Sequence, residues 1–310
     1  MYSSTIAFIL FILNTFIYET TAKAIVIWHG MGDSYSNPDS MGKIIDIIKT
    51  ELPDTFVHSI GLAETQNDDR NAGFFGIIDK QVDYVCEQLA KIPELSNGFD
   101  AIGFSQGGLF LRSYVQKCNQ PKVRTLITFG SPHGGVSDIP NCIDKFDFKC
   151  TLMRSMVKRG VYTDYVQHHV IQAQYYKDPS DVEKYLERNI FLPSINNELT
   201  IKNKTYHDHL SSLENFIMIK FSNDTMIKPA ETAWFWTLGE EYKLIPLEEQ
   251  DIYNKDWLGL QTLNQEGKLK FLECPGTHMH ITDDYFIKEI IRKYLLQEKR
   301  NQFNLQQPRP

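Results

Sequence analysis

Short apolar runs alternate with amphipathic stretches along the first 130 residues and again near the C-terminus. The runs are rich in Ile, Val and Phe and have the length of buried strands, whereas the amphipathic stretches repeat apolar residues at helical spacing. Strands are predicted at 24–28, 56–60, 101–104, 123–129, 216–221 and 268–273, and helices at 41–50, 74–92, 107–117 and 283–296. This alternation predicts an α/β fold with a mainly parallel central sheet and helices on both faces.

The alternation breaks off after the predicted strand at 123–129. Residues 134–215 are rich in Tyr, His, Asp and Asn and show short helical patterns without clear sheet strands. Because strand-like segments return afterwards, we expect one domain over residues 23–300 with an insertion at about 134–215. The insertion is predicted to form a mostly helical cap, and residues 301–310 a C-terminal tail.

The first 22 residues have the pattern of a secretory signal peptide. Their apolar run, from Ile6 to Leu13, is shorter than the roughly 20 residues that a membrane-spanning helix needs. Thr20 and Ala22 place small residues at −3 and −1 of a cut after Ala22. The segment departs from the usual pattern because no Lys or Arg precedes the run, and a buried N-terminal helix is the alternative. No later stretch is apolar enough to span a bilayer.

Charge and cysteine content narrow the functional classes. The 32 Lys and Arg residues against 39 Asp and Glu give a formal charge of −7, which gives nucleic-acid binding little electrostatic support. Five cysteines in an exported chain favour disulfides, although their spacing leaves the pairing open. Neither a CxxC motif nor a Cys/His cluster at zinc spacing occurs, so no metal or cofactor is expected.

The motif with the clearest chemical meaning is Gly-Phe-Ser-Gln-Gly at residues 103–107. It falls where a predicted strand meets a predicted helix, which is the setting of the nucleophile elbow of α/β-hydrolases. A tight turn between such a strand and helix exposes the serine hydroxyl in a cleft, and the helix N-terminus favours developing negative charge. Ser105 is therefore the candidate nucleophile.

A serine nucleophile needs a histidine base that is oriented by a carboxylate. In this fold the acid and then the histidine follow late strands. Asp224 follows the predicted strand at 216–221, and His278 follows the one at 268–273. The alternatives are His280 as the base and Asp283 or Asp284 as the acid.

The oxyanion formed during acyl transfer requires two backbone N–H donors. One comes from the residue after the nucleophile, Gln106, and the other from the loop after an early strand. The segment 29–33, His-Gly-Met-Gly-Asp, follows the first predicted strand, and Met31 is the candidate donor there.

Together these motifs resemble the palmitoyl-protein thioesterases. The resemblance is carried by the segments 29–33, 103–108, 129–135 (Phe-Gly-Ser-Pro-His-Gly-Gly) and 223–224 (Asn-Asp), and it is nearer to the lysosomal type 1 enzymes than to type 2. It implies hydrolysis of long-chain fatty acyl thioesters on cysteines of S-palmitoylated proteins, in the lysosomal lumen or after secretion. It also implies a catalytic triad of Ser105, Asp224 and His278, with Met31 and Gln106 as oxyanion donors.

The same resemblance implies a role for most of the cysteines and for two glycosylation sequons. It implies disulfides between Cys86 and Cys118 and between Cys142 and Cys150, with Cys274 free. The sequons begin at Asn203 and Asn223, and both match glycosylated positions of the family.

The acyl chain requires an apolar groove, and the predicted insertion is its expected wall. Any single apolar residue of the insertion is more readily explained as core of the cap than as wall. The residues considered for the wall are Ile171, Val182, Leu186, Ile190, Phe191, Leu192, Ile195 and Leu199. Two other functions stay open. A lipase or carboxylesterase would use the same triad on oxygen esters, and a catalytically silent hydrolase fold would only bind its ligand.

Overall fold

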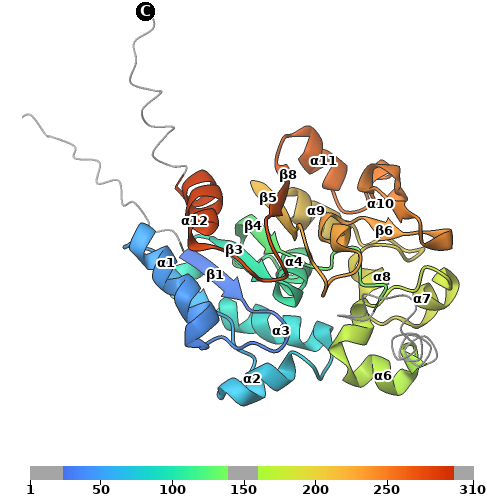
Figure 1. Cartoon of the computed structure of the whole chain (residues 1–310), viewed down its shortest axis with the longest axis horizontal. Helices are drawn as coiled ribbons and strands as arrows, with labels where there is room; N and C mark the ends of the chain where they lie inside the picture. The colour runs from blue at the N-terminus through green and yellow to red at the C-terminus, as the bar shows by residue number, and fades with distance from the viewer. Residues whose placement is uncertain (1–23, 139–159, 297–310) are drawn as a thin grey trace, which may run out of the picture.

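The computed structural model describes residues 24–138 and 160–296 (Figure 1). The predicted signal peptide at 1–22, the tail at 301–310 and the predicted pairing of Cys142 with Cys150 lie outside these residues.

Six parallel strands form the central sheet in the order β2-β1-β3-β4-β5-β8. They are β1 (Ala24–Trp28), β2 (Phe56–Ser59), β3 (Phe99–Phe104), β4 (Val123–Phe129), β5 (Asn215–Phe221) and β8 (Leu269–Cys274). A separate antiparallel hairpin consists of β6 (Thr237–Leu238) and β7 (Leu244–Ile245). Every predicted sheet strand is present within a few residues of its expected bounds, and the predicted mainly parallel sheet is confirmed.

Helices cover both faces of this sheet. The helices of the described residues are α1 (Lys43–Glu51), α2 (Gln66–Ala72), α3 (Ile78–Leu89), α4 (Gln106–Lys117), α6 (Asp164–His169), α7 (Val182–Arg188), α8 (Leu192–Ile195), α9 (Lys204–Ser211), α10 (Asp251–Asn254), α11 (Leu260–Gln265) and α12 (Asp283–Tyr285), which continues as a π-helical stretch at Phe286–Leu295. Figure 1 shows α1 and α12 at one end of the molecule and α6 and α7 at the other.

Alternate side chains of each strand enter two different hydrophobic cores. In β1, Val26 and Trp28 pack with α3 and α4, whereas Ile25 and Ile27 pack with α1 and the final helix. This division follows from the period of two along a strand, because neighbouring side chains point to opposite faces. A sheet buried on both faces therefore needs the nearly continuous apolar runs that the sequence contains.

Three local features differ from the sequence-based predictions. The helix predicted at 74–92 is shorter, because α3 starts at Ile78 after a segment in which Ile77 has an extended backbone. α2 was not expected, since its sequence QNDDRNA has no apolar stripe; Thr65 caps it by accepting a hydrogen bond from the Asp68 N–H. The β6–β7 hairpin is too short to leave a periodic pattern.

The chain leaves the sheet after β4 and returns to a neighbouring position as β5. The described part of the segment between β4 and β5 contains α6, the 3₁₀ turn η3 (Ile171–Tyr175), α7, α8 and α9. α9 returns to the body of the protein and packs on α4. A disulfide between Cys86 and Cys118 joins α3 to the residue after α4, and Cys274 is a buried free thiol.

Candidate active site

Ser105 sits on a tight turn between β3 and α4. Its backbone has φ 51° and ψ −122°, a conformation that a residue with a side chain rarely adopts. The turn brings strand and helix so close that a Cβ atom on Gly103 would lie 2.2 Å from Cα of Gly108. Glycine at 103 is therefore required for this approach, and Ser105, which follows the last residue of β3, lines a cavity.

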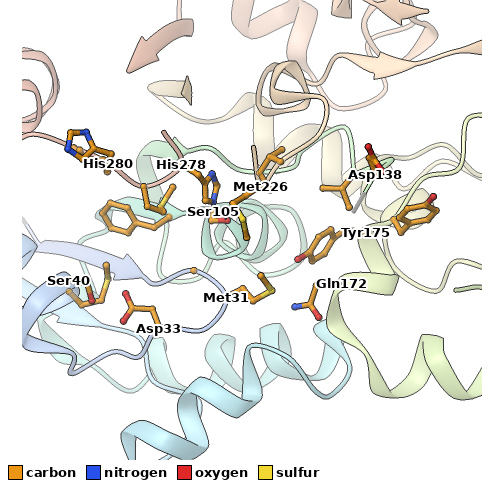
Figure 2. A pocket seen from close by; sticks show the side chains of 18 of the residues that line it. Met31, Asp33, Ser40, Ser105, Asp138, Gln172, Tyr175, Met226, His278 and His280 are labelled. Carbon is orange, nitrogen blue, oxygen red and sulfur yellow. Dashed lines mark hydrogen bonds between the residues drawn. The ribbon is translucent and has the colours of Figure 1, made fainter. Parts of the chain in front are cut away.

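His278 lies next to that hydroxyl (Figure 2), and Asp224 lies on the far side of the imidazole. Nε2 of His278 is 2.9 Å from Oγ of Ser105, and Nδ1 is 2.7 Å from Oδ2 of Asp224. The second carboxylate oxygen, Oδ1, accepts the backbone N–H groups of Met226 and Ile227, each at 2.9 Å. The Asp224 side chain is 1% exposed and that of His278 is 12% exposed. The carboxylate is thus fixed on one side by backbone and holds the imidazole on the other.

The rival residues lie elsewhere. The side chain of His280 is exposed and lies at one end of the cavity, away from Ser105 (Figure 2). Asp283 forms an ion pair with Lys43 at 2.6 Å, and Asp284 pairs with Lys288 at 2.6 Å. Of the candidate bases and acids, the structure therefore brings His278 and Asp224 together with Ser105.

The loop 29–33 packs directly against the nucleophile. A Cβ atom on Gly30 would lie 3.1 Å from Cβ of Ser105, and the side chain of Met31 lies beside the serine (Figure 2). Gln106 is the first residue of α4, where backbone N–H groups have no acceptor within the helix. Both predicted oxyanion donors thus adjoin Ser105, and their role stays a prediction.

A buried pair that the sequence analysis missed anchors this loop. Nε2 of His29 is 3.0 Å from Oδ2 of Asp69 on α2, and the two side chains are 2% and 0% exposed. Nδ1 of His29 donates to the carbonyl oxygen of Gly30 at 2.9 Å. Both ring nitrogens thus face oxygen atoms that can only accept, an arrangement that favours the doubly protonated imidazole and hence an ionic pair. Asp69 also accepts the N–H groups of Tyr35 and Leu62, so it ties three loops together.

The pair has a pH window that follows from opposite shifts of its two pKa values. Burial lowers the pKa of His29, but the hydrogen bond and charge of Asp69 outweigh it and raise the pKa above 6.5. Burial raises the pKa of Asp69, but His29 and two backbone donors outweigh it and lower the pKa below 3.8. The histidine contribution is complete below pH 6.5 and is lost as the pH rises through its raised pKa. The aspartate contribution is complete above pH 3.8 and is lost as the pH falls through its lowered pKa.

We expect Asp69→Asn to destabilise the protein most in the mildly acidic range. Near pH 5 the substitution leaves His29 buried without its counter-charge, which is expected to lower the free energy of unfolding by about 3 kcal/mol. At pH 9 the loss should be smaller, because the wild-type histidine contribution declines as the pH rises through the raised pKa of His29. Urea denaturation at both pH values measures the difference. Asp68→Asn on the exposed side of α2 is the matched control, expected to change stability by at most about 0.5 kcal/mol. Equal losses of unfolding free energy for Asp69→Asn at the two pH values would contradict an ionic pair between His29 and Asp69.

The side chain of Gln106 connects the start of α4 to the residue after α2 and to η3. Its Nε2 donates to the carbonyl oxygen of Gly73 at 3.1 Å, and its Oε1 accepts from the Tyr175 hydroxyl at 3.1 Å and from Gln172 at 3.2 Å. Gln172 also donates to Gly73 at 2.9 Å. The residue after the nucleophile is thus held by side-chain bonds as well as by α4.

Ser105 and His278 open into a cavity of about 1030 Å³. On the side of α6 and η3 its lining is mostly apolar, comprising Val136, Val161, Val166, Val170, Ala173, Tyr175, Tyr176, Met226 and Ile227 together with Gln172 and Asp138. None of the eight apolar residues proposed from the sequence lines it. Ile171, Phe191, Leu192 and Ile195 fill the core instead, and Val182 and Leu199 are exposed. Periodicity could identify buried positions but not which of them face a cavity.

Other features of the described residues concern binding more broadly. Within 24–138 and 160–296, the acidic, histidine and cysteine side chains form no group of three that could hold a metal ion. In the same ranges no helix has the length and apolarity to cross a membrane. The side chains of Asn203 and Asn223 are exposed.

Comparison with known proteins assigns the chain that carries this site to a family. The model of the palmitoyl protein thioesterase family matches residues 24–278, which include Ser105, Asp224 and His278. The chain belongs to the palmitoyl protein thioesterase family. Palmitoyl-protein thioesterase 1 of Caenorhabditis elegans is 38% identical over 279 residues, covering 89% of this chain and 93% of the relative. Palmitoyl-protein thioesterase 3 of Dictyostelium discoideum is 33% identical, covering 86% and 89%.

Membership of the palmitoyl protein thioesterase family confirms two predictions. The chain is a thioesterase, and its fold is that of the α/β-hydrolases, with the nucleophile candidate after β3 of a parallel sheet. A more distant relative is named a lysosomal thioesterase PPT2 homolog, from Drosophila melanogaster. It is 29% identical, covering 88% of this chain and 92% of the relative.

Proposed function

We propose that this enzyme removes palmitoyl and similar long acyl groups from protein cysteines through an acyl-serine intermediate. The observation that carries the proposal is the hydrogen-bonded line from Asp224 through His278 to Ser105, which ends at a cavity with an apolar side. A serine hydroxyl becomes a useful nucleophile when a positioned imidazole accepts its proton.

In the first half-reaction, Oγ of Ser105 attacks the thioester carbonyl carbon while Nε2 of His278 takes the hydroxyl proton. Negative charge develops on the carbonyl oxygen, where the N–H groups of Met31 and Gln106 donate to it. The C–S bond then breaks, and His278 returns the proton to the departing cysteine sulfur. Because a thiol has a pKa near 8.5, its departure needs less protonation than that of an amine.

In the second half-reaction, His278 removes a proton from a water molecule that attacks the acyl-serine. The fatty acid leaves and Ser105 regains its proton. Asp224 keeps the imidazole in the tautomer that accepts from Ser105 and stabilises the imidazolium that forms in each half-reaction. The apolar side of the cavity takes the acyl chain, at about 0.8 kcal/mol for each CH₂ removed from water.

The test is the turnover of a palmitoyl-cysteine peptide against the same peptide carrying palmitoyl-serine. The proposal expects kcat/KM to be well above that for the oxygen ester. Turnover of the oxygen ester alone would make the protein a lipase or carboxylesterase instead. Absence of turnover on both, together with no labelling of Ser105 by a fluorophosphonate, would indicate a silent fold.

We place this activity in the lysosomal lumen, reached through the secretory pathway, with secretion as a second destination. The predicted signal peptide, the disulfide between Cys86 and Cys118 and the exposed sequon residues Asn203 and Asn223 support this location. Endoglycosidase treatment of the protein expressed in animal cells tests glycosylation. Removal of the glycan from each occupied sequon should increase the mobility of the protein on a gel.

A further inference from the structure

The cavity extends to both sides of Ser105. Figure 2 shows Gln172, Tyr175 and Asp138 on one side of the serine and Asp33, Ser40 and His280 on the other. The first side is the apolar part beneath α6 and η3. The second, which we call the polar arm, is lined by Asp33, Asp39, Ser40, Met41, Lys43, Ile44, Met279, His280, Ile281, Thr282 and Asp283. The nucleophile thus stands at the junction of two compartments of different chemistry.

A thioester bound at this junction has to use both compartments. Its acyl chain and its cysteine-bearing part leave the carbonyl carbon in different directions. If the acyl chain fills the apolar part, as the proposed function requires, then the polypeptide around the cysteine lies along the polar arm. The inference below therefore rests on that proposed function and concerns the side of the substrate that leaves first.

The polar arm carries an excess of negative charge. Its lining contains the carboxylates of Asp33, Asp39 and Asp283 and the ammonium group of Lys43, a net charge of −2. Lys43 and Asp283 offset each other through their ion pair at 2.6 Å. Asp33 accepts hydrogen bonds from two neutral donors, the N–H of Ser34 and the side-chain amide of Asn37, and its charge also helps to raise the pKa of His29. Asp39 is exposed at the rim.

We propose that the polar arm selects palmitoylated cysteines that are flanked by basic residues. Lys or Arg beside the cysteine would place its charge near Asp33 and Asp39 while the apolar floor formed by Met41 and Ile44 contacts the rest of the peptide. Acidic flanking residues would face like charge. The contacts lie at a partly open surface, so selectivity should be moderate and should weaken with salt.

Three palmitoyl-cysteine peptides test the proposal, identical except for Lys, Gln or Glu at the two positions on each side of the cysteine. At pH 7.5, where an ordinary histidine is mostly neutral, and at low salt, kcat/KM should fall in the order Lys, Gln, Glu. The expected ratio of Lys to Glu peptide is about 10-fold, shrinking toward unity in 0.5 M salt. Equal turnover of the three peptides would overturn this inference alone. No turnover of any peptide would overturn the proposed function as well.

Substitutions at Asp39 locate the effect. Asp39→Asn should reduce the ratio to about 3-fold, and Asp39→Lys should bring it to unity or reverse it. Asp46→Asn makes the same change of charge at an exposed position of α1 outside the cavity lining, and it should leave the ratio unchanged. Two results would overturn the assignment to the polar arm. One is a Lys-to-Glu peptide ratio that Asp39→Lys does not alter, and the other is an Asp46→Asn variant that changes the ratio as much as Asp39→Asn does.

Discussion

Ser105→Ala is expected to lower kcat/KM for palmitoyl-cysteine peptides by about 10⁵- to 10⁶-fold. The substitution removes the atom that would form the acyl-enzyme bond, and water cannot occupy the same position with the same orientation toward His278, 2.9 Å away. Stopped assays with an acyl-peptide substrate and high enzyme concentration measure the residual rate. The acyl-enzyme, visible in the wild type by mass spectrometry after rapid acid quenching, should be absent.

A serine elsewhere on the same helix provides the control. Ser113 is fully buried in α4 and does not line the cavity, so Ser113→Ala should keep activity within a few-fold of wild type. Both variants should unfold within about 1 kcal/mol of the wild-type free energy, because each loses one oxygen atom. Activity above a tenth of wild type in Ser105→Ala would mean that another group is the nucleophile.

Asp224→Asn is expected to lower kcat by about 10⁴-fold with little change in KM. The reason lies in the two N–H groups that Oδ1 accepts from Met226 and Ile227. An asparagine satisfies them with its carbonyl oxygen, which turns its NH₂ group toward Nδ1 of His278. The imidazole must then accept at Nδ1 and carry its proton on Nε2, where it cannot take the proton of Ser105. Steady-state kinetics on the palmitoyl-cysteine peptide measure the effect.

Asp284→Asn is the matched change for this position. Asp284 forms a surface pair with Lys288 and follows His278 at short distance in sequence, so it was a rival acid. The Asp284→Asn variant should keep its kcat within about twofold of the wild-type value. A similar loss in both variants, or an Asp224→Asn enzyme that keeps more than a tenth of its kcat, would count against the role given to Asp224.

The sheet, and the finding that Ser105, Asp224 and His278 lie together, could be predicted from the sequence. Each buried strand leaves an apolar run, the elbow needs a glycine two positions before Ser105, and in this fold the acid and base follow late strands in a fixed order. The ends of helices were less predictable: apolar residues at 74 and 77 continue the pattern of α3 although the chain is not helical there.

Features that depend on contacts distant in sequence escaped prediction. His29 and Asp69 are 40 residues apart, and neither belongs to a pattern that indicates a buried ion pair. The residues of the apolar cavity wall could not be chosen from the sequence for a related reason. Ile171 is buried in the core, whereas its neighbours Val170 and Gln172 line the cavity, and short irregular segments have no period from which to assign direction.

The bond between Cys86 and Cys118 bears on how the protein can be produced. Its two ends are 32 residues apart, and the loop they close contains β3, Ser105 and α4. Closing such a loop restricts the unfolded chain and typically contributes about 2–4 kcal/mol. A bacterial cytosol keeps thiols reduced, so expression there forfeits this contribution in the segment that presents the serine. A periplasmic or eukaryotic secretory host is therefore the suitable source of folded enzyme for kinetic work.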